Sequence, residues 1–95
     1  MKLMMKPNQK FTHYCDSGHG WVAVKKELLK HLGIADKISS CSYMRGKTAY
    51  LEEDDDATTF IEEVKRRDIN INIVSKHCKK DRSPIRSYET YKGGD

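Results

Sequence analysis

Cysteine and histidine are the residue types in this chain best suited to metal binding or nucleophilic chemistry. The three cysteines, Cys15, Cys41 and Cys78, form an odd set, whereas a secreted domain more often carries an even number joined in disulfides. In a reducing cytoplasm such cysteines behave as small, partly buried apolar residues. We therefore expect reduced cysteines in a soluble, cytoplasmic protein.

Zinc is the metal that these side chains would hold. One ligand set combines Cys15 and Cys78 with His13 and His19, and His77 is an alternative ligand. Thiolates and imidazoles are suitable zinc ligands. However, the chain has no Cys-x-x-Cys or His-x-x-x-His pair that would form half of a site in advance. We predict no metal and no cofactor.

The run Ser17-Gly18-His19-Gly20 predicts a turn, and His19 beside Trp21 could bind a ligand. The turn is not a phosphate-binding P-loop, because the Gly-Lys-Ser/Thr ending is missing. A catalytic His19 needs a positioned partner, and the sequence identifies none. His77 and Cys78 are adjacent on a predicted strand, so their side chains would point to opposite faces. We predict no catalytic activity; a small nuclease or nucleotide hydrolase using His19 and Arg86 is the least favoured alternative.

The segment from Lys76 to Lys92 interleaves cations with tyrosines. Lysine and arginine contact phosphates and tyrosine stacks on bases, but arginine also pairs with carboxylates on protein surfaces. Alternatively, this segment is an ordered coil that wraps the domain, with Tyr88 and Tyr91 covering the core. Over the whole chain, the candidate binding residues are His19, Trp21, Arg45, Lys79, Lys80, Arg82, Arg86, Tyr88 and Tyr91.

The charges of the chain are segregated along the sequence. Its 95 residues include 18 Lys and Arg against 14 Asp and Glu, a net charge of +4, but residues 52–68 carry −5 and residues 76–92 carry +4. The basic blocks suggest an anionic partner, although the blocks could also neutralise each other in the fold. No apolar run is long enough to cross a bilayer or to act as a signal peptide, so we expect no membrane association.

Length and hydrophobic pattern predict one small α+β domain, with two helices packed on one face of an antiparallel sheet of about four strands. Residues 1–9 are expected to be a flexible terminus and residues 10–92 the domain. Alternating or β-branched residues predict strands over 11–16, 21–24 and 69–74, the last of them half-buried. A hairpin is predicted between 38–45 and 48–52 through Gly46-Lys47, which suits a type II′ turn and brings Tyr43 close to Tyr50.

Two segments have helical patterns. Residues 25–32 place three leucines on one side, and Gly33 follows as a helix-ending residue. The three aspartates 54–56 precede the second helix, and we expect one of them to cap its free N–H groups. The apolar stripe of this helix, with helical spacing, consists of Ala57, Phe60, Ile61 and Val64.

Five short motifs together resemble a family of small uncharacterised proteins of bacteriophages and prophages. They are CDSGHGW at 15–21, GIADKISS at 33–40, YMRG at 43–46, YLEED at 50–54 and IRSY at 85–88. The resemblance spans about residues 13–91. The chain differs from the family pattern at Ser17, Cys41 and Asp55, where the family has proline, an aromatic residue and cysteine. These differences argue against a shared chemistry that depends on cysteine.

The resemblance carries no activity and implies a phage origin with an accessory role in an infected bacterial cell. It also points to His19, Arg45, Arg86 and Tyr88 as candidate site residues. We therefore predict a phage accessory protein that binds rather than catalyses and inhibits a host defence or regulatory factor. The alternative is a nucleic-acid- or nucleotide-binding protein that uses the basic segment 76–92. The partner would be a host protein or an anionic ligand, and a homodimer is one option for the oligomeric state.

Overall fold

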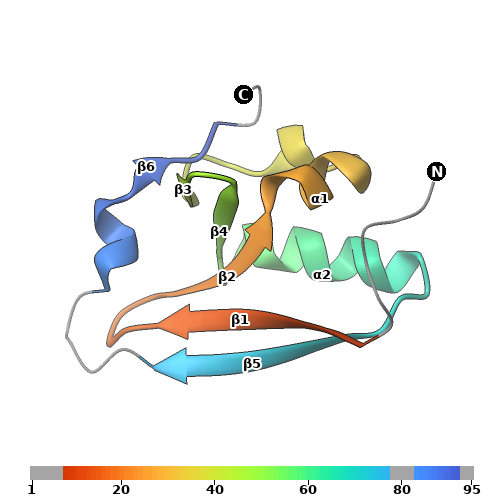
Figure 1. Cartoon of the computed structure of the whole chain (residues 1–95), viewed down its shortest axis with the longest axis horizontal. Coiled ribbons are helices and arrows are strands. Elements are labelled where there is room, and N and C mark those ends of the chain that lie inside the picture. Colours follow the sequence, from red (N-terminus) through yellow and green to blue (C-terminus); the bar gives the residue numbers. More distant parts are fainter. Residues whose placement is uncertain (1–7, 78–82, 93–95) are drawn as a thin grey trace.

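Six strands form one mixed sheet that packs with two α-helices (Figure 1). The computed structural model describes residues 8–77 and 83–92. In chain order the elements are β1 (Gln9–Cys15), β2 (Gly20–Lys25), α1 (Lys26–His31), η1 (Ala35–Lys37), β3 (Tyr43–Arg45), β4 (Thr48–Glu52), α2 (Asp56–Arg66), β5 (Ile71–His77), η2 (Pro84–Ser87) and β6 (Glu89–Thr90). The strand order across the sheet is β5-β1-β2-β4-β3-β6. The predicted α+β class is therefore confirmed.

The sheet has more strands than predicted, and one pair is parallel. β5 runs parallel to β1, with Ile71 beside Gln9 and His77 beside Cys15. The other pairs are antiparallel, including the pair of β6 with β3. Parallel neighbours need a long connection, which the chain between β1 and β5 supplies. The prediction of about four antiparallel strands was thus too low in number and wrong for the β1–β5 pair.

Local sequence signals placed both helices and the hairpin correctly. Helix α1 ends before Gly33, which has a φ of +73°, the left-handed conformation that glycine adopts easily. Gly46 has a φ of +59° at the first position of the β3–β4 turn, as a type II′ turn requires. Tyr43 lies opposite Tyr50 across the hairpin, as predicted. No helix in the described residues is long and apolar enough to span a bilayer.

One hydrophobic core joins both helices to the same face of the sheet. Phe60 of α2 is fully buried and meets Phe11 of β1 edge-on, with 5.1 Å between the ring centres. The other core side chains include Val22, Val24, Leu28, Leu29, Ala49, Leu51, Ala57 and Val64. Burying a side chain of this size stabilises a fold by roughly 1.5–3 kcal/mol. This face of the sheet, covered by α1 and α2, is called the helix face below.

The expected aspartate cap of α2 is wrong. Asp55 occupies the N-cap position, but its side chain makes no capping hydrogen bond. Instead, the buried carboxylate of Asp56 accepts hydrogen bonds from the Ser39 backbone N–H at 3.0 Å, from the Ser39 hydroxyl at 2.8 Å and from the Ser42 hydroxyl. These bonds hold the loop before β3 against α2. Residues 38–42 therefore form a loop rather than the first half of the predicted hairpin strand.

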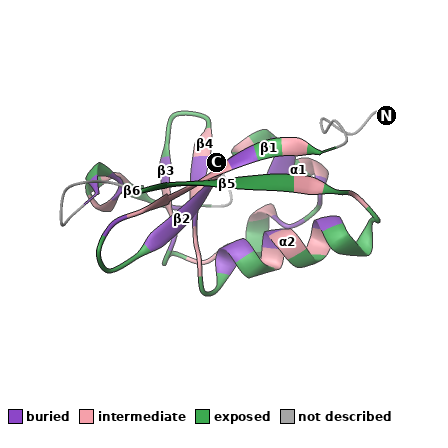
Figure 2. Cartoon of the chain, turned by 90° about the horizontal axis from the view of Figure 1, so that it is seen from below, coloured by how far each residue is buried: buried purple, intermediate pink, exposed green. Residues whose placement is uncertain are grey.

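The last predicted strand is shifted and more exposed than expected. It forms β5, in which six of the seven residues are exposed (Figure 2). Ile73 and Val74 each keep 37% of their surface exposed. The alternating sequence indicated one buried side, but β5 is an edge strand whose isoleucines only partly reach the core. The prediction of a half-buried strand therefore holds for Ile69 and Ile71, which pack against the core, and fails for Ile73.

Candidate binding face

Aromatic and arginine side chains gather on the sheet face opposite the helix face. The alternation of side chains along the strands puts Tyr14, Trp21, Tyr43 and Tyr50 on this side, and Tyr88 packs onto it. These five residues define the tyrosine face. It holds four of the five tyrosines of the chain and its single tryptophan. The segregation separates amphipathic rings from the aliphatic core.

The rings of Tyr14, Tyr50 and Tyr88 form a chain of contacts across the tyrosine face. Ring centres are 6.2 Å apart between Tyr14 and Tyr50, and 5.2 Å apart between Tyr50 and Tyr88. Ala23 lies opposite Tyr50 on β2, where its small side chain leaves room for the rings. Burial raises the pKa of Tyr50 above its usual value, and the neighbouring phenols add to this rise. The Tyr50 phenol is therefore neutral at physiological pH and is able to donate a hydrogen bond.

Arg45 is positioned at the edge of the tyrosine face by Tyr88. Its guanidinium carbon lies 5.2 Å from the centre of the Tyr88 ring, and its Nη1 donates to the Tyr88 hydroxyl at 3.2 Å. An arginine above an aromatic ring gains a cation–π interaction. Arg45 remains exposed, so it still offers donors to a partner.

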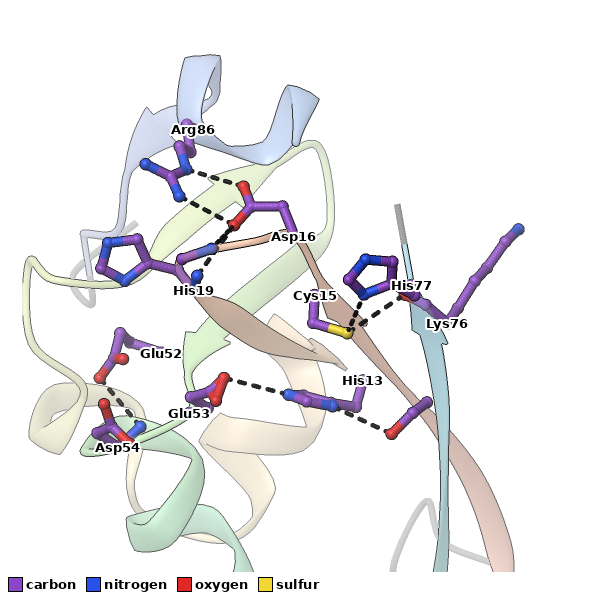
Figure 3. Close-up of polar contacts among 12 residues, drawn as sticks. His13, Cys15, Asp16, His19, Glu52, Glu53, Asp54, Lys76, His77 and Arg86 are labelled. Atoms are coloured by element: carbon purple, nitrogen blue, oxygen red, sulfur yellow. Dashed lines mark hydrogen bonds and ion pairs between the residues drawn. The ribbon is translucent and has the colours of Figure 1, made fainter. Parts of the chain in front are cut away.

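Asp16 holds the C-terminal segment against the sheet. Its side chain has no exposed surface, and its carboxylate accepts two hydrogen bonds from the guanidinium of Arg86, both at 2.9 Å (Figure 3). The backbone N–H of Ser83 donates to the same carboxylate at 2.7 Å. Bidentate pairs between arginine and carboxylate are strong and directional. These contacts, which we call the Asp16–Arg86 clasp, fix η2 beside the turn between β1 and β2.

Asp16 also shapes the Gly-His-Gly turn. Its Oδ1 accepts hydrogen bonds from the backbone N–H groups of Gly18 at 3.0 Å and His19 at 2.9 Å, as in an Asx turn. The Arg86 guanidinium, helped by the backbone donors, holds the pKa of Asp16 far below its usual value, although burial acts in the opposite direction. The carboxylate therefore stays ionised. One buried charge thus organises both the turn and η2.

Trp21 lies beneath the Asp16–Arg86 clasp. It is only 2% exposed, and the guanidinium carbon of Arg86 lies 5.9 Å from its ring centre. Its ring also meets those of Tyr43 and His19, at 6.2 Å and 6.1 Å between centres. A Cβ at Gly18 would lie 3.0 Å from Nη2 of Arg86, so the turn packs closely on the arginine. Trp21 therefore supports this surface rather than facing a ligand.

Among the hollows on the tyrosine face, two are lined by several of its aromatic rings. The first has a volume of about 350 Å³ and is lined by Tyr14, Tyr50, Lys76, His77, Ser83, Pro84, Ile85 and Tyr88. The second has a volume of about 330 Å³ and is lined by His19, Trp21, Cys41, Tyr43, Glu52 and Arg86. Volumes above about 300 Å³ are typical of small-ligand pockets. The first hollow combines aromatic walls with a lysine at its rim.

The predicted binding residues fall into three groups. His19, Trp21, Arg45, Arg86 and Tyr88 lie together on the tyrosine face, because η2 packs beside the β1–β2 turn. Tyr91 instead lies in the core, 4% exposed, and its hydroxyl donates to the Ala35 carbonyl at 2.7 Å. It therefore supports the fold and offers no surface to a partner. The remaining candidates, Lys79, Lys80 and Arg82, lie outside the described residues.

Sequence reasoning missed part of this surface. Tyr43 and Tyr50 were predicted only as a stabilising cross-strand pair, and Tyr14 only as a strand residue. The alternation that placed them on one side of their strands was a usable signal. The sequence pattern includes Asp16 only within the CDSGHGW motif, although Asp before Ser-Gly is typical of an Asx turn. Its pairing with Arg86, 70 residues away, had no local signal.

A polar cluster lies on the helix face at the ends of β1 and β5 (Figure 3). Cys15 Sγ is 3.5 Å from His77 Nδ1. His13 contacts Ser75 Oγ at 3.2 Å and Glu53 at 3.5 Å. Within residues 8–77 and 83–92, no three His, Cys, Asp or Glu side chains converge as metal ligands. Cys78, part of the zinc alternative, lies outside those ranges.

Comparison with known proteins finds no relative of this chain. No protein-family model, no curated protein and no solved structure matches the chain. The functional argument therefore depends on the tyrosine face and its chemistry.

Proposed function

We propose that this protein acts by binding a host protein in a phage-infected bacterial cell, where it inhibits a defence or regulatory factor. The observation that carries the proposal is the gathering of four tyrosines and two arginines on the tyrosine face, above the buried ring of Trp21. Tyrosine, tryptophan and arginine are the residues most enriched in the energetic centres of protein interfaces. The partner surface that they suit is one with acidic and apolar groups.

The rigidity of the tyrosine face supports a binding role. The Asp16–Arg86 clasp holds η2, which ends at Ser87, and the next residue, Tyr88, packs on Tyr50. Side chains held in place before binding lose little conformational entropy when a partner arrives. The guanidinium of Arg86 is paired with Asp16. Among the described residues, Arg45 is therefore the arginine of the tyrosine face that is exposed to a partner.

The proposal is tested by affinity purification from a bacterial host lysate, with the tagged wild-type protein and two variants. We expect the wild type to retain one host protein in a stoichiometric complex that survives size exclusion. Tyr88→Ala should weaken that complex by about 30-fold or more, as loss of a hot-spot tyrosine does. The control is Thr58→Ala, an exposed position on α2, which should bind as the wild type does. Recovery of nucleic acid alone would contradict the proposal.

Binding of a nucleotide or single-stranded nucleic acid is the second candidate. The observation in its favour is the hollow of about 350 Å³ that places the rings of Tyr14, Tyr50 and Tyr88 beside Lys76. Bases stack on aromatic rings, and cations contact the phosphates. Titration with a fluorescent oligonucleotide should then show affinity that falls steeply between 50 and 200 mM salt. Absent or salt-independent binding would exclude this candidate.

A further inference from the structure

Strand β5 presents a long unpaired edge. It lies at the end of the sheet, and no described strand pairs with its outer side. Its seven residues include no proline, and Ile73 and Val74 are the exposed large hydrophobic residues of the described chain. Such an edge carries free backbone N–H and C=O groups that are ready to pair with another strand. It is therefore a surface for adding a strand.

The opposite edge of the sheet is protected in ways that β5 is not. Strand β6 is only two residues long and consists of Glu89 and Thr90, both exposed. A short, polar edge strand gives little opportunity for pairing. In contrast, β5 has one lysine, Lys76, and an apolar centre. The partner that fits β5 must bring its own strand and must tolerate that lysine.

A second β5 satisfies both conditions through symmetry. A two-fold axis perpendicular to the sheet makes two identical edge strands antiparallel and places one residue opposite its own copy. When all seven residues overlap, this residue is Val74, the middle of the strand. The remaining pairs across the axis are Ile73 with Ser75, Asn72 with Lys76, and Ile71 with His77.

This register is compatible in charge and polarity. Each Lys76 faces an asparagine, so no two lysines oppose each other. Val74 faces Val74, and the exposed side chains of Val74 and Ile73 become covered. Apolar cross-strand pairs contribute roughly 0.2–1 kcal/mol each, while like charges directly opposite are unfavourable.

We propose that two copies of this chain pair through antiparallel β5 strands centred on Val74 and form one continuous sheet. The two-fold axis perpendicular to the sheet leaves both tyrosine faces on the same side. The dimer would therefore present two binding surfaces side by side. Two linked surfaces bind a repetitive or dimeric partner more tightly than one. Dimerisation itself does not depend on the proposed host partner.

Sedimentation velocity of the full chain over a range of concentrations tests the dimer. The wild type should show a concentration-dependent change from monomer to dimer. Val74→Lys places two lysines against each other and should weaken the dimer roughly tenfold or more. The matched control is Thr58→Lys, which adds the same charge at an exposed position of α2 and should dimerise as the wild type does. Circular dichroism and thermal unfolding establish that each variant is folded.

A second variant tests the register. Asn72→Asp should place two carboxylates opposite the two Lys76 side chains and tighten the dimer roughly three- to tenfold at low salt. A wild-type protein that stays monomeric at the highest concentrations tested would overturn the proposal. Equal dimerisation of Val74→Lys and Thr58→Lys would overturn it as well. An Asn72→Asp variant that dimerises no more tightly would overturn the register centred on Val74.

Discussion

The two faces of the sheet use the same strands for different purposes. On the helix face, Val24, Leu51 and Phe60 are at most 1% exposed, and the protein itself completes their contacts. On the tyrosine face, Tyr14 and Tyr50 remain half-buried, with polar hydroxyl groups and hollows beside them. Aliphatic side chains gain most from complete burial, whereas tyrosine combines apolar area with a polar end. The helix face therefore provides stability, and the tyrosine face is suited to recognition.

Each face also has a buried aspartate that holds a distant loop. Asp56 lies with the core of α2 and is satisfied by two serines, Ser39 and Ser42. Asp16 is satisfied by the charge of Arg86 and by backbone donors. The serine donors attach the loop before β3 to α2, and the ion pair with Arg86 attaches η2 to the β1–β2 turn. The following experiments test this division between the faces.

The largest effect is expected from Phe60→Ala on the helix face. Removing this fully buried ring leaves a cavity against Phe11 and should lower the free energy of unfolding by about 3–5 kcal/mol. Denaturant unfolding followed by circular dichroism measures the change. Phe60→Leu is the control and should cost less than half as much. A loss below about 1 kcal/mol for Phe60→Ala would contradict the stabilising role of this face.

The second effect concerns the loop held by Asp56. Asp56→Ala leaves the Ser39 N–H and two serine hydroxyls without their acceptor, and should lower the free energy of unfolding by about 2–3 kcal/mol. Asp55→Ala, at the N-cap position without a capping hydrogen bond, should change it by less than about 0.5 kcal/mol. The same unfolding assay compares the two. Equal losses would contradict the view that the hydrogen bonds from Asp56 to the loop stabilise the fold more than the N-cap residue does.

The third effect is the pH dependence of the Asp16–Arg86 clasp. Asp16→Asn keeps the shape but removes the charge, and should lower the Tm at pH 7 by on the order of 5 °C. Because the folded pKa of Asp16 is depressed, its contribution is complete above its unfolded pKa of about 4 and is lost as the pH falls toward the folded pKa. The Tm difference between wild type and Asp16→Asn should therefore shrink below about pH 4.

A second acidic group provides an internal control for that measurement. Arg66 and Arg67 lower the pKa of Glu63 to about 2, and its acid-dependent loss of stability is present in both proteins. Subtracting the two Tm curves therefore isolates Asp16. A difference that stays constant down to pH 2 would show that Asp16 does not hold η2 through its charge.

The smallest effect on stability is expected from Tyr14→Ala on the tyrosine face. The half-buried ring contributes mainly its contact with Tyr50, so the free energy of unfolding should fall by less than about 1 kcal/mol. Binding to the captured host protein should nevertheless weaken by about 30-fold. Isothermal titration calorimetry beside denaturant unfolding measures both quantities. A large loss of stability with unchanged binding would indicate that Tyr14 stabilises the fold and does not contribute to recognition.

The elements that could be predicted are those with local causes. Gly33 and Gly46 mark a helix end and a tight turn because only their own backbone conformation is involved. The apolar stripe of α2 and the Tyr43–Tyr50 pair follow from spacing over a few residues. The prediction that an aspartate caps α2 was wrong, because the side chain of Asp56 instead accepts hydrogen bonds from serines 14 and 17 residues away.

By itself, the sequence determined the class of the domain, its helices, its hairpin and the alternation that separates tyrosines from aliphatic residues. The tertiary structure alone decided that β5 returns beside β1 and that Asp16 meets Arg86. Contacts between residues about 60–70 positions apart have no local pattern, because many chain segments compete for each partner. Their selection depends on which arrangement buries the core and satisfies every buried charge at the same time. In this arrangement, candidate residues that are far apart in the sequence, such as Arg45 and Tyr88, lie on one surface.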